Sequence, residues 1–265
     1  MKICTFRNAL VDINSQPLTV EDVAISLSRT FRYCGFTAYP YSVLWHSIVV
    51  GFLMMERTKQ REALFVGLTH DVGETISRDI ASPIKDEHCS SLEFFEDTVR
   101  QTFIYGLNWE DFGLASKDVV GRITDLTQKY EGDLHVVDKT IVRRAEMRLL
   151  FPPAARMAIN NDLGAEQGAV LECLYPIIGA VDAPGVSEEY AHAIEYSRYD
   201  IDNGLSIQHC AFPLDGIAML RCLLSLSMEW VVNPKGDTVP TVEDILSSAL
   251  KPFMNKPLPE ESNAK

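Results

Sequence analysis

Positive charge is scarce in this chain of 265 residues. Lys and Arg number 24 against 37 Asp and Glu, which gives a formal net charge of −13. Proteins that bind the phosphate backbone of nucleic acids need clustered Lys and Arg. The composition therefore argues against duplex nucleic acid as a partner. It stays compatible with a small anionic substrate held by a metal ion and a few local basic residues.

Closely spaced cysteines are also absent. No two of the 6 cysteines form a Cys-x-x-Cys unit, and the chain is too long for a small disulfide scaffold. We expect reduced, mostly buried thiols in a cytoplasmic protein. The residues concerned are Cys4, Cys34, Cys89, Cys173, Cys210 and Cys222.

Long apolar runs are missing as well. The most apolar one, Ile217 to Val232, is interrupted by Arg221 and Glu229. It is too short and too charged for a membrane-spanning helix. Residues 1–7 contain no apolar signal core. We therefore expect no association with a membrane.

Helical periodicity accounts for most of the chain, and strand signals are few, so we expect an all-α fold. Thr19 is the expected N-cap of a helix that runs to about Tyr33, with Asp22 at its third position. Ser42 is the expected N-cap of a helix that runs to about Glu56. Further helices are expected at 61–76, at 86–107 with Phe94 on the buried face, at 116–130, at 132–150 and at 213–232.

The most distinctive stretch of the sequence is 64–74. An apolar run leads into the adjacent pair His70 and Asp71, and Glu74 follows Asp71 at the third position. On a helix, spacings of three and four residues place side chains on neighbouring parts of one surface. An imidazole and two carboxylates there are costly to bury without a compensating partner such as a divalent metal ion. The alternative is a hydrogen-bonded polar patch at a helix end.

Two more polar residues stand within apolar helical segments. His46 lies deep in the helix expected after Ser42, where an isolated histidine is often a hydrogen-bonded core residue and not a ligand. Asp138 lies among Val136, Val137, Ile141 and Val142, and an aspartate in such surroundings needs a partner. That partner is either a neighbouring Lys or Arg or a metal ion.

Together, these residues form a mixed donor set of two imidazoles and two carboxylates: His46, His70, Asp71 and Asp138. Such a set suits Mn²⁺, Co²⁺, Mg²⁺, Zn²⁺, Fe²⁺ or Ni²⁺ and leaves positions open for water and a phosphate oxygen. A bound ion lowers the pKa of its water and polarises a phosphoryl group. A carboxyl group that is not a ligand can then move a proton, and Glu74 and Asp79 are available for that role.

The ordered motifs resemble the HD-domain metal-dependent phosphohydrolases, and in particular a bacterial and phage subgroup that acts on nucleotides. Similar proteins include deoxynucleoside 5′-monophosphatases and phage deoxyadenosine-triphosphate triphosphohydrolases. The resemblance covers about residues 1–150. It is carried by Val20–Ala24, Leu27–Arg29, Arg32–Tyr33, Tyr41–Val43, His46, His70–Asp71, Glu74, Asp79–Lys85 and Asp138.

The resemblance implies an HD-domain helical bundle that hydrolyses phosphate or triphosphate from a nucleotide with one divalent ion. The residues that match metal ligands of the family are His46, His70, Asp71 and Asp138. Those that match residues assisting catalysis are Glu74 and Asp79. Arg32 and Lys85 are the residues expected to contact phosphate.

The sequence departs from the family pattern in some places. Trp45 stands before the first metal-binding histidine, where a smaller or polar residue is usual, and this could alter the pocket. His88 and His135 leave a second metal ion open. Residues 151–265 match nothing in the family. We expect them to form a helical extension packed on the core, which covers the site or mediates contacts in a homo-oligomer.

Two other functions stay open alongside hydrolysis. One is a non-catalytic nucleotide-binding or regulatory module on the same fold, which would be expected to lack Glu74 or Asp79. The other is a helical interaction protein whose polar residues are surface caps. Within the hydrolase hypothesis, the sequence does not separate monophosphate from triphosphate substrates, and it does not identify the base.

Overall fold

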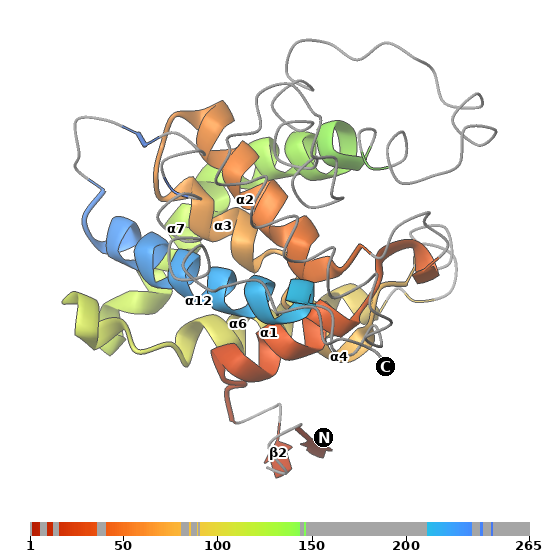
Figure 1. The fold of residues 1–265 in the computed structure, drawn as a ribbon. Coiled ribbons are helices and arrows are strands. Elements are labelled where there is room, and N and C mark those ends of the chain that lie inside the picture. The colour runs from red at the N-terminus through yellow and green to blue at the C-terminus, as the bar shows by residue number, and fades with distance from the viewer. Residues whose placement is uncertain are drawn as a thin grey trace, which may run out of the picture.

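The computed structural model confirms an all-α fold, with a short two-stranded hairpin at the N-terminus (Figure 1). The structure describes residues 2–5, 10–12, 16–35, 41–80, 85, 89, 91–143, 146, 211–234, 239–240 and 245. The expected boundary near residue 150 and most of the expected extension lie outside these ranges. No helix in the described part is long and apolar enough to cross a membrane.

The N-terminal segment forms an antiparallel hairpin of β1 (Lys2–Cys4) and β2 (Leu10–Asp12), followed by α1 (Val20–Arg29). Thr19 caps α1 as predicted. Its hydroxyl accepts the Asp22 N–H at 3.2 Å, and Asp22 Oδ2 accepts the Thr19 N–H at 3.2 Å. This reciprocal pair satisfies two backbone donors that a helix start leaves free.

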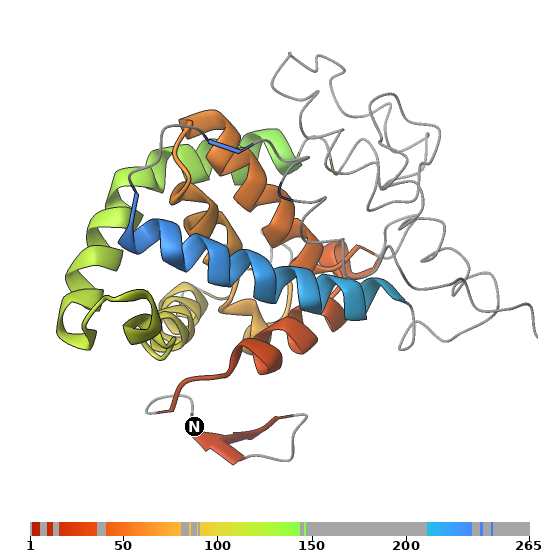
Figure 2. The same cartoon turned by 60° about the vertical axis from the view of Figure 1, so that its left-hand side comes forward.

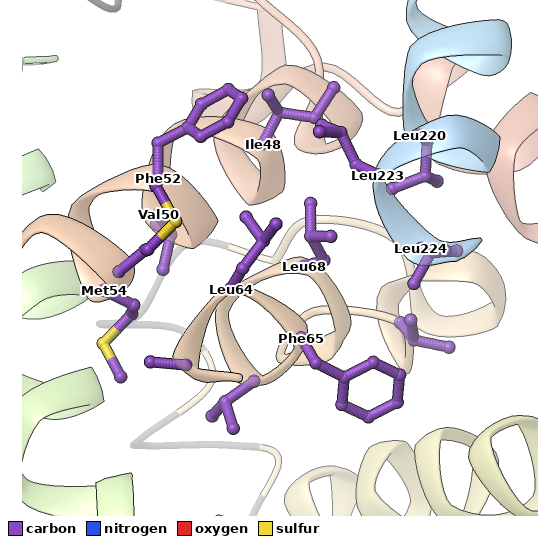
Figure 3. Packing of buried hydrophobic residues seen from close by; sticks show 14 of the residues in the cluster. Ile48, Val50, Phe52, Met54, Leu64, Phe65, Leu68, Leu220, Leu223 and Leu224 are labelled. Atoms are coloured by element: carbon purple, nitrogen blue, oxygen red, sulfur yellow. The ribbon is translucent and has the colours of Figure 1, made fainter. Parts of the chain in front are cut away.

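The centre of the core is the pair α2 (Val43–Thr58) and α3 (Ala63–Thr69). Ser42 caps α2, as predicted. The two helices approach closely because glycines face each other: a Cβ added at Gly67 would lie 2.4 Å from the Gly51 Cα. Figure 3 shows apolar side chains of both helices packed with those of a third, α12.

Four elements follow α3 and carry the chain past the core. They are α4 (Glu74–Ser77), α6 (Leu92–Tyr105), the 3₁₀ helix η2 (Trp109–Phe112) and α7 (Ser116–His135). A π-helical segment, η3 (Val136–Val142), continues α7 directly. Residues 116–142 are therefore one continuous run in which Gly132 makes no break, and not two separate helices.

The long C-terminal helix α12 (Ala211–Val232) matches the segment expected at 213–232. It crosses the body of the molecule and lies against α1 and α3 (Figures 1 and 2). Leu220, Leu223 and Leu224 of α12 are almost fully buried. This helix, far along the chain from α1–α3, thus completes their core.

Several local expectations were wrong. The first helix ends at Arg29 and not near Tyr33, and the helix expected at 61–76 breaks into α3 and α4 around the turn 70–73. Phe94 is 80% exposed and so does not belong to the buried face of α6. The three cysteines described as free are not buried either: Cys34 and Cys222 are exposed, and Cys89 is partly exposed.

Candidate metal centre

The structure brings the four predicted metal ligands together from three separate parts of the chain. His46 comes from the first turn of α2, His70 and Asp71 from the turn after α3, and Asp138 from η3. His46 Nε2 lies 3.2 Å from His70 Nε2 and 3.2 Å from Asp138 Oδ1. Asp71 Oδ2 lies 3.1 Å from His70 Nε2 and 3.4 Å from His46 Nε2.

Each imidazole is oriented through its other nitrogen. His46 Nδ1 lies 2.6 Å from Glu146 Oε1, and His70 Nδ1 lies 2.7 Å from the Gly67 carbonyl oxygen. Each acceptor calls for a proton on Nδ1, which directs Nε2 toward the centre. When both rings are neutral, two nitrogen lone pairs and two carboxylates converge, and a cation is the partner that this arrangement needs.

The donor atoms are compatible with one divalent ion. One donor atom from each of His46, His70 and Asp138 lies within 4.8 Å of the other two. With Asp71 the set is two nitrogen and two oxygen donors, which suits the first-row divalent metals and Mg²⁺. The π-helical turn that carries Asp138 is a rare conformation that often occurs at functional sites.

Charges around the centre hold the carboxylates ionised. Burial opposes ionisation of Asp71 and Asp138, but the imidazoles of His46 and His70 keep both pKa values well below their usual range. Burial and the charge of Arg32 lower the pKa of His46, yet Glu146 and Asp138 outweigh them and raise it to about 9. In the metal-free protein His46 is therefore protonated at neutral pH, and an entering cation must displace that proton.

Glu74 and Asp79, the expected catalytic residues, lie beside the centre in different surroundings. Glu74 is buried, and its Oε2 accepts no hydrogen bond within the described residues. Burial and the nearby Asp71 carboxylate raise the pKa of Glu74 to about 9. Asp79 Oδ2 accepts the Tyr33 backbone N–H at 2.7 Å, and its Oδ1 lies 3.8 Å from Arg32 Nη1. These surroundings favour the protonated form of Glu74, while Asp79 acts as a hydrogen-bond acceptor.

The two expected phosphate-binding residues are both paired with carboxylates. Arg32 Nη1 lies 3.4 Å from Asp71 Oδ2, and Arg32 Nε lies 3.3 Å from Glu146 Oε2. Lys85 is ion-paired with Glu96 on α6. Arg32 therefore lies beside the candidate metal ligand Asp71, whereas Lys85 would have to leave Glu96 to reach a phosphate.

Three residues of the site were given no role from the sequence: Glu146, Tyr33 and Lys139. Glu146 is fully buried and contacts His46, Arg32 and the Tyr33 hydroxyl, which donates to its Oε2 at 2.8 Å. Lys139 lies 2.8 Å from Asp138 Oδ2. The sequence offered one weak signal for Glu146, which follows Asp138 by eight residues within the helix expected at 132–150.

The remaining histidine expectations are only partly covered by the structure. His135 is exposed at the end of α7 and does not join the cluster. His88 lies outside the described residues. Trp45, the departure beside His46, is buried in the core.

Comparison with known proteins adds little to this geometry. No family model matches the chain. A stretch of 73 residues, 28% of the chain, is 33% identical to YfdR of Escherichia coli K12, which is described as an uncharacterized protein. The match spans 38% of the length of YfdR. It indicates common ancestry of this segment and does not indicate an activity.

Proposed function

We propose that this chain is an HD-domain phosphohydrolase, which uses one divalent metal ion to remove phosphate or triphosphate from a nucleotide. The observation that supports this most is the convergence of the two imidazole Nε2 atoms, 3.2 Å apart, with the carboxylates of Asp71 and Asp138. Their Nδ1 atoms are already committed to Glu146 and to the Gly67 carbonyl. A structural polar cluster would not need both imidazoles to present the same nitrogen to one point.

The residues present fit a divalent ion held by His46, His70, Asp71 and Asp138. Such an ion, when bound, supplies an acidified water and polarises a phosphoryl oxygen. Glu74, buried next to Asp71, is the carboxyl group that would exchange a proton with a leaving oxygen or with the attacking water. Asp79, fixed by the Tyr33 N–H, keeps Arg32 at the edge of the centre.

The proposed setting is a cytoplasmic homo-oligomer that acts on small nucleotides and not on nucleic acid duplexes. The net charge of −13 supports the choice of a small substrate, because long phosphate backbones would be repelled. Free thiols at Cys34, Cys89 and Cys222 fit a reducing compartment.

A nucleotide screen tests the proposal directly. Purified protein is incubated with each deoxynucleoside mono- and triphosphate in the presence of Mn²⁺, Co²⁺, Mg²⁺, Zn²⁺, Fe²⁺ or Ni²⁺, and release of phosphate and triphosphate is followed. We expect turnover with at least one metal, and its abolition by His70→Ala and by Asp138→Ala. His135→Ala, which removes an exposed histidine, should leave turnover unchanged.

The other outcomes separate the alternatives. Tight metal binding and nucleotide binding without turnover would replace the hydrolase with a regulatory nucleotide-binding module. Failure to bind any of the metals would leave a helical interaction protein. Full activity in His70→Ala or Asp138→Ala would refute the assignment of the centre.

A further inference from the structure

A cavity lies between the N-terminal hairpin, α1, η1 (Arg32–Gly35) and α4. Its volume of about 650 Å³ is in the range of small-molecule sites, roughly 300–1,000 Å³. None of the four proposed metal ligands lines it, nor does Arg32. Asp79 alone of the predicted site residues does.

Two arginines and two aspartates line the cavity. Arg29 and Arg78 both line it, and within the described residues neither is ion-paired with a carboxylate. The two carboxylates on its wall are engaged elsewhere, Asp22 with the Thr19 cap and Asp79 with the Tyr33 N–H. An anionic ligand could therefore pair with Arg29 and Arg78 without displacing a carboxylate that is ion-paired with either of them.

Arg78 is held in place at some conformational cost. Its backbone has φ 69° and ψ 168°, a region that is essentially restricted to glycine. Its Nη1 donates to Thr30 Oγ1 at 3.0 Å and to Ser26 Oγ at 3.3 Å, and both hydroxyl groups belong to the cavity lining. The structure thus fixes a guanidinium group against two hydroxyls at the cavity wall.

The rest of the lining is largely apolar. Side chains of Ile3 from β1, Ile25 from α1, Phe31 and Ile76 contribute to it. A simple anion such as phosphate would occupy only a fraction of such a volume. A ligand with an aromatic ring and a phosphate group matches both the arginines and the apolar side chains of the lining. Guanidinium groups bind phosphate in a forked geometry, and apolar side chains pack against a ring.

We propose that this cavity is a second ligand site, distinct from the metal centre, which binds an organic phosphate of nucleotide size through Arg29 and Arg78. This site does not depend on the proposed hydrolase activity. Binding there should need no divalent ion, because no metal ligand lines the cavity. Asp79 lines the cavity and lies beside Arg32, so a ligand in the cavity should also change metal affinity at the candidate centre.

The test is calorimetric titration of the full chain in excess EDTA. The probes are the four deoxynucleoside monophosphates, the four triphosphates and inorganic phosphate. We expect at least one nucleotide to bind, and inorganic phosphate to bind at least tenfold more weakly. Arg78→Gly and Arg29→Ala should each weaken nucleotide binding about tenfold or more.

Two controls guard against trivial explanations. Arg57→Ala removes the same charge from α2, where Arg57 pairs with Asp133 away from the cavity, and should leave binding unchanged. Arg78→Gly also relieves the strained backbone, so its unfolding temperature should not fall while its binding does. A loss of binding in Arg57→Ala equal to that in Arg78→Gly would reduce the effect to net charge and overturn the site.

Cys34 gives an independent readout, because it is exposed and lines the cavity. We expect a saturating nucleotide in EDTA to slow alkylation of Cys34 by iodoacetamide at least fivefold, and to leave exposed Cys222 on α12 unaffected. Protection and binding should persist in His70→Ala, so they survive even if the hydrolase proposal fails. No nucleotide binding in EDTA, or binding that His70→Ala abolishes and Arg78→Gly preserves, would overturn the proposal.

Discussion

Glu146 links three residues around the candidate centre, His46, Tyr33 and Arg32. One of its oxygens faces His46 Nδ1, and the other accepts from the Tyr33 hydroxyl and lies beside Arg32 Nε. Although burial disfavours ionisation, Arg32 and His46 lower the pKa of Glu146 to about 2. A buried carboxylate in this position fixes the ring orientation of His46 and raises its basicity, which makes Glu146 a positioning residue.

Glu146→Gln should weaken metal binding about 10–100-fold, because the amide keeps the shape of the side chain but loses the charge that supports His46. Isothermal titration with Mn²⁺ or Co²⁺ measures the change. Tyr33→Phe is the matched control, since it removes only the hydroxyl that donates to the same carboxylate. Tyr33→Phe should lose less metal affinity than Glu146→Gln. An equal loss in both variants would mean that the network acts through packing and not through the charge on Glu146.

Sequence reasoning found the residues that touch the proposed ion but not the residue behind them. His46, His70 and Asp138 stand out because a polar group in an apolar segment needs a partner. Glu146 follows Arg143 and Arg144 in a charged stretch, where its neighbours alone predict an exposed residue. Its burial depends on how η3 meets α2, which is information about the fold that no local pattern contains.

The protons bound in the metal-free centre make stability depend on pH. His46 and Glu74 have pKa values raised to about 9, above the ordinary values of 6.5 and 4.5, so the folded protein binds more protons than the unfolded chain. Stability from the His46 proton is complete below pH 6.5 and is lost as the pH rises through 9. The lowered pKa values of Asp71, Asp138 and Glu146 make stability depend on pH only in acid, below the ordinary pKa of a carboxyl group.

In EDTA, the unfolding temperature should therefore fall between pH 6.5 and 9, as followed by scanning calorimetry. With saturating Mn²⁺ the fall should be smaller, because the ion displaces the proton and binds more tightly as the pH rises. His135→Gln serves as the control, because it removes an exposed histidine and should leave the profile unchanged. A flat profile in EDTA would mean that neither His46 nor Glu74 holds an extra proton in the folded metal-free protein.

At the scale of elements, the break between α3 and α4 sets the geometry of the centre. His70 and Asp71 lie in the turn 70–73 directly after α3, and the Gly67 carbonyl in α3 accepts from His70 Nδ1. Gly67 also lies directly against the Gly51 backbone on α2. The close contact of these two helices thus fixes the distance between His46 and His70.

Gly67→Ala should destabilise the protein by about 1–3 kcal/mol or more, because the new Cβ would lie 2.4 Å from the Gly51 Cα and the helices must separate. We also expect weaker metal binding, since His46 and His70 would move apart. Gly121→Ala on α7 is the control: its Cβ meets nothing within 4 Å, and it should stabilise by about 0.5–1 kcal/mol. Chemical denaturation measures the free energy of unfolding of both variants. If Gly67→Ala and Gly121→Ala changed it by the same amount, the close contact between α2 and α3 would not be the cause.

Elements with their own start signals were predictable, and those shaped by tertiary contacts were not. Thr19 and Ser42 cap their helices as expected because an N-cap is a local interaction. The apolar run within 61–76 gave no sign of the turn at 70–73. Gly132 suggested a boundary that the continuous run of 116–142 does not show.

At the scale of the whole molecule, the described part has one core and not a separate core for each end of the chain. Figure 3 shows Leu220, Leu223 and Leu224 of α12 beside Ile48, Leu64 and Leu68. Arg122 on α7 also donates to the Val231 carbonyl near the end of α12, at 2.8 Å and 3.0 Å. The segments that supply the metal ligands therefore rely on a helix that follows them by some 70 residues (211 against 138).

A fragment of residues 1–150 should not fold cooperatively or bind metal, although it contains every proposed ligand, because removal of α12 exposes the buried faces of α1 and α3 to water. Circular dichroism and thermal melts of the fragment and the full chain check this.

Substitutions on α12 in the intact chain test the same dependence without truncation. Leu223→Ala should cost about 2–5 kcal/mol. Arg221→Ala, which removes an exposed ion pair with Glu21, should cost less than about 1 kcal/mol. A fragment that melts cooperatively and binds Mn²⁺ as the full chain does would show that α12 merely covers a self-sufficient catalytic domain.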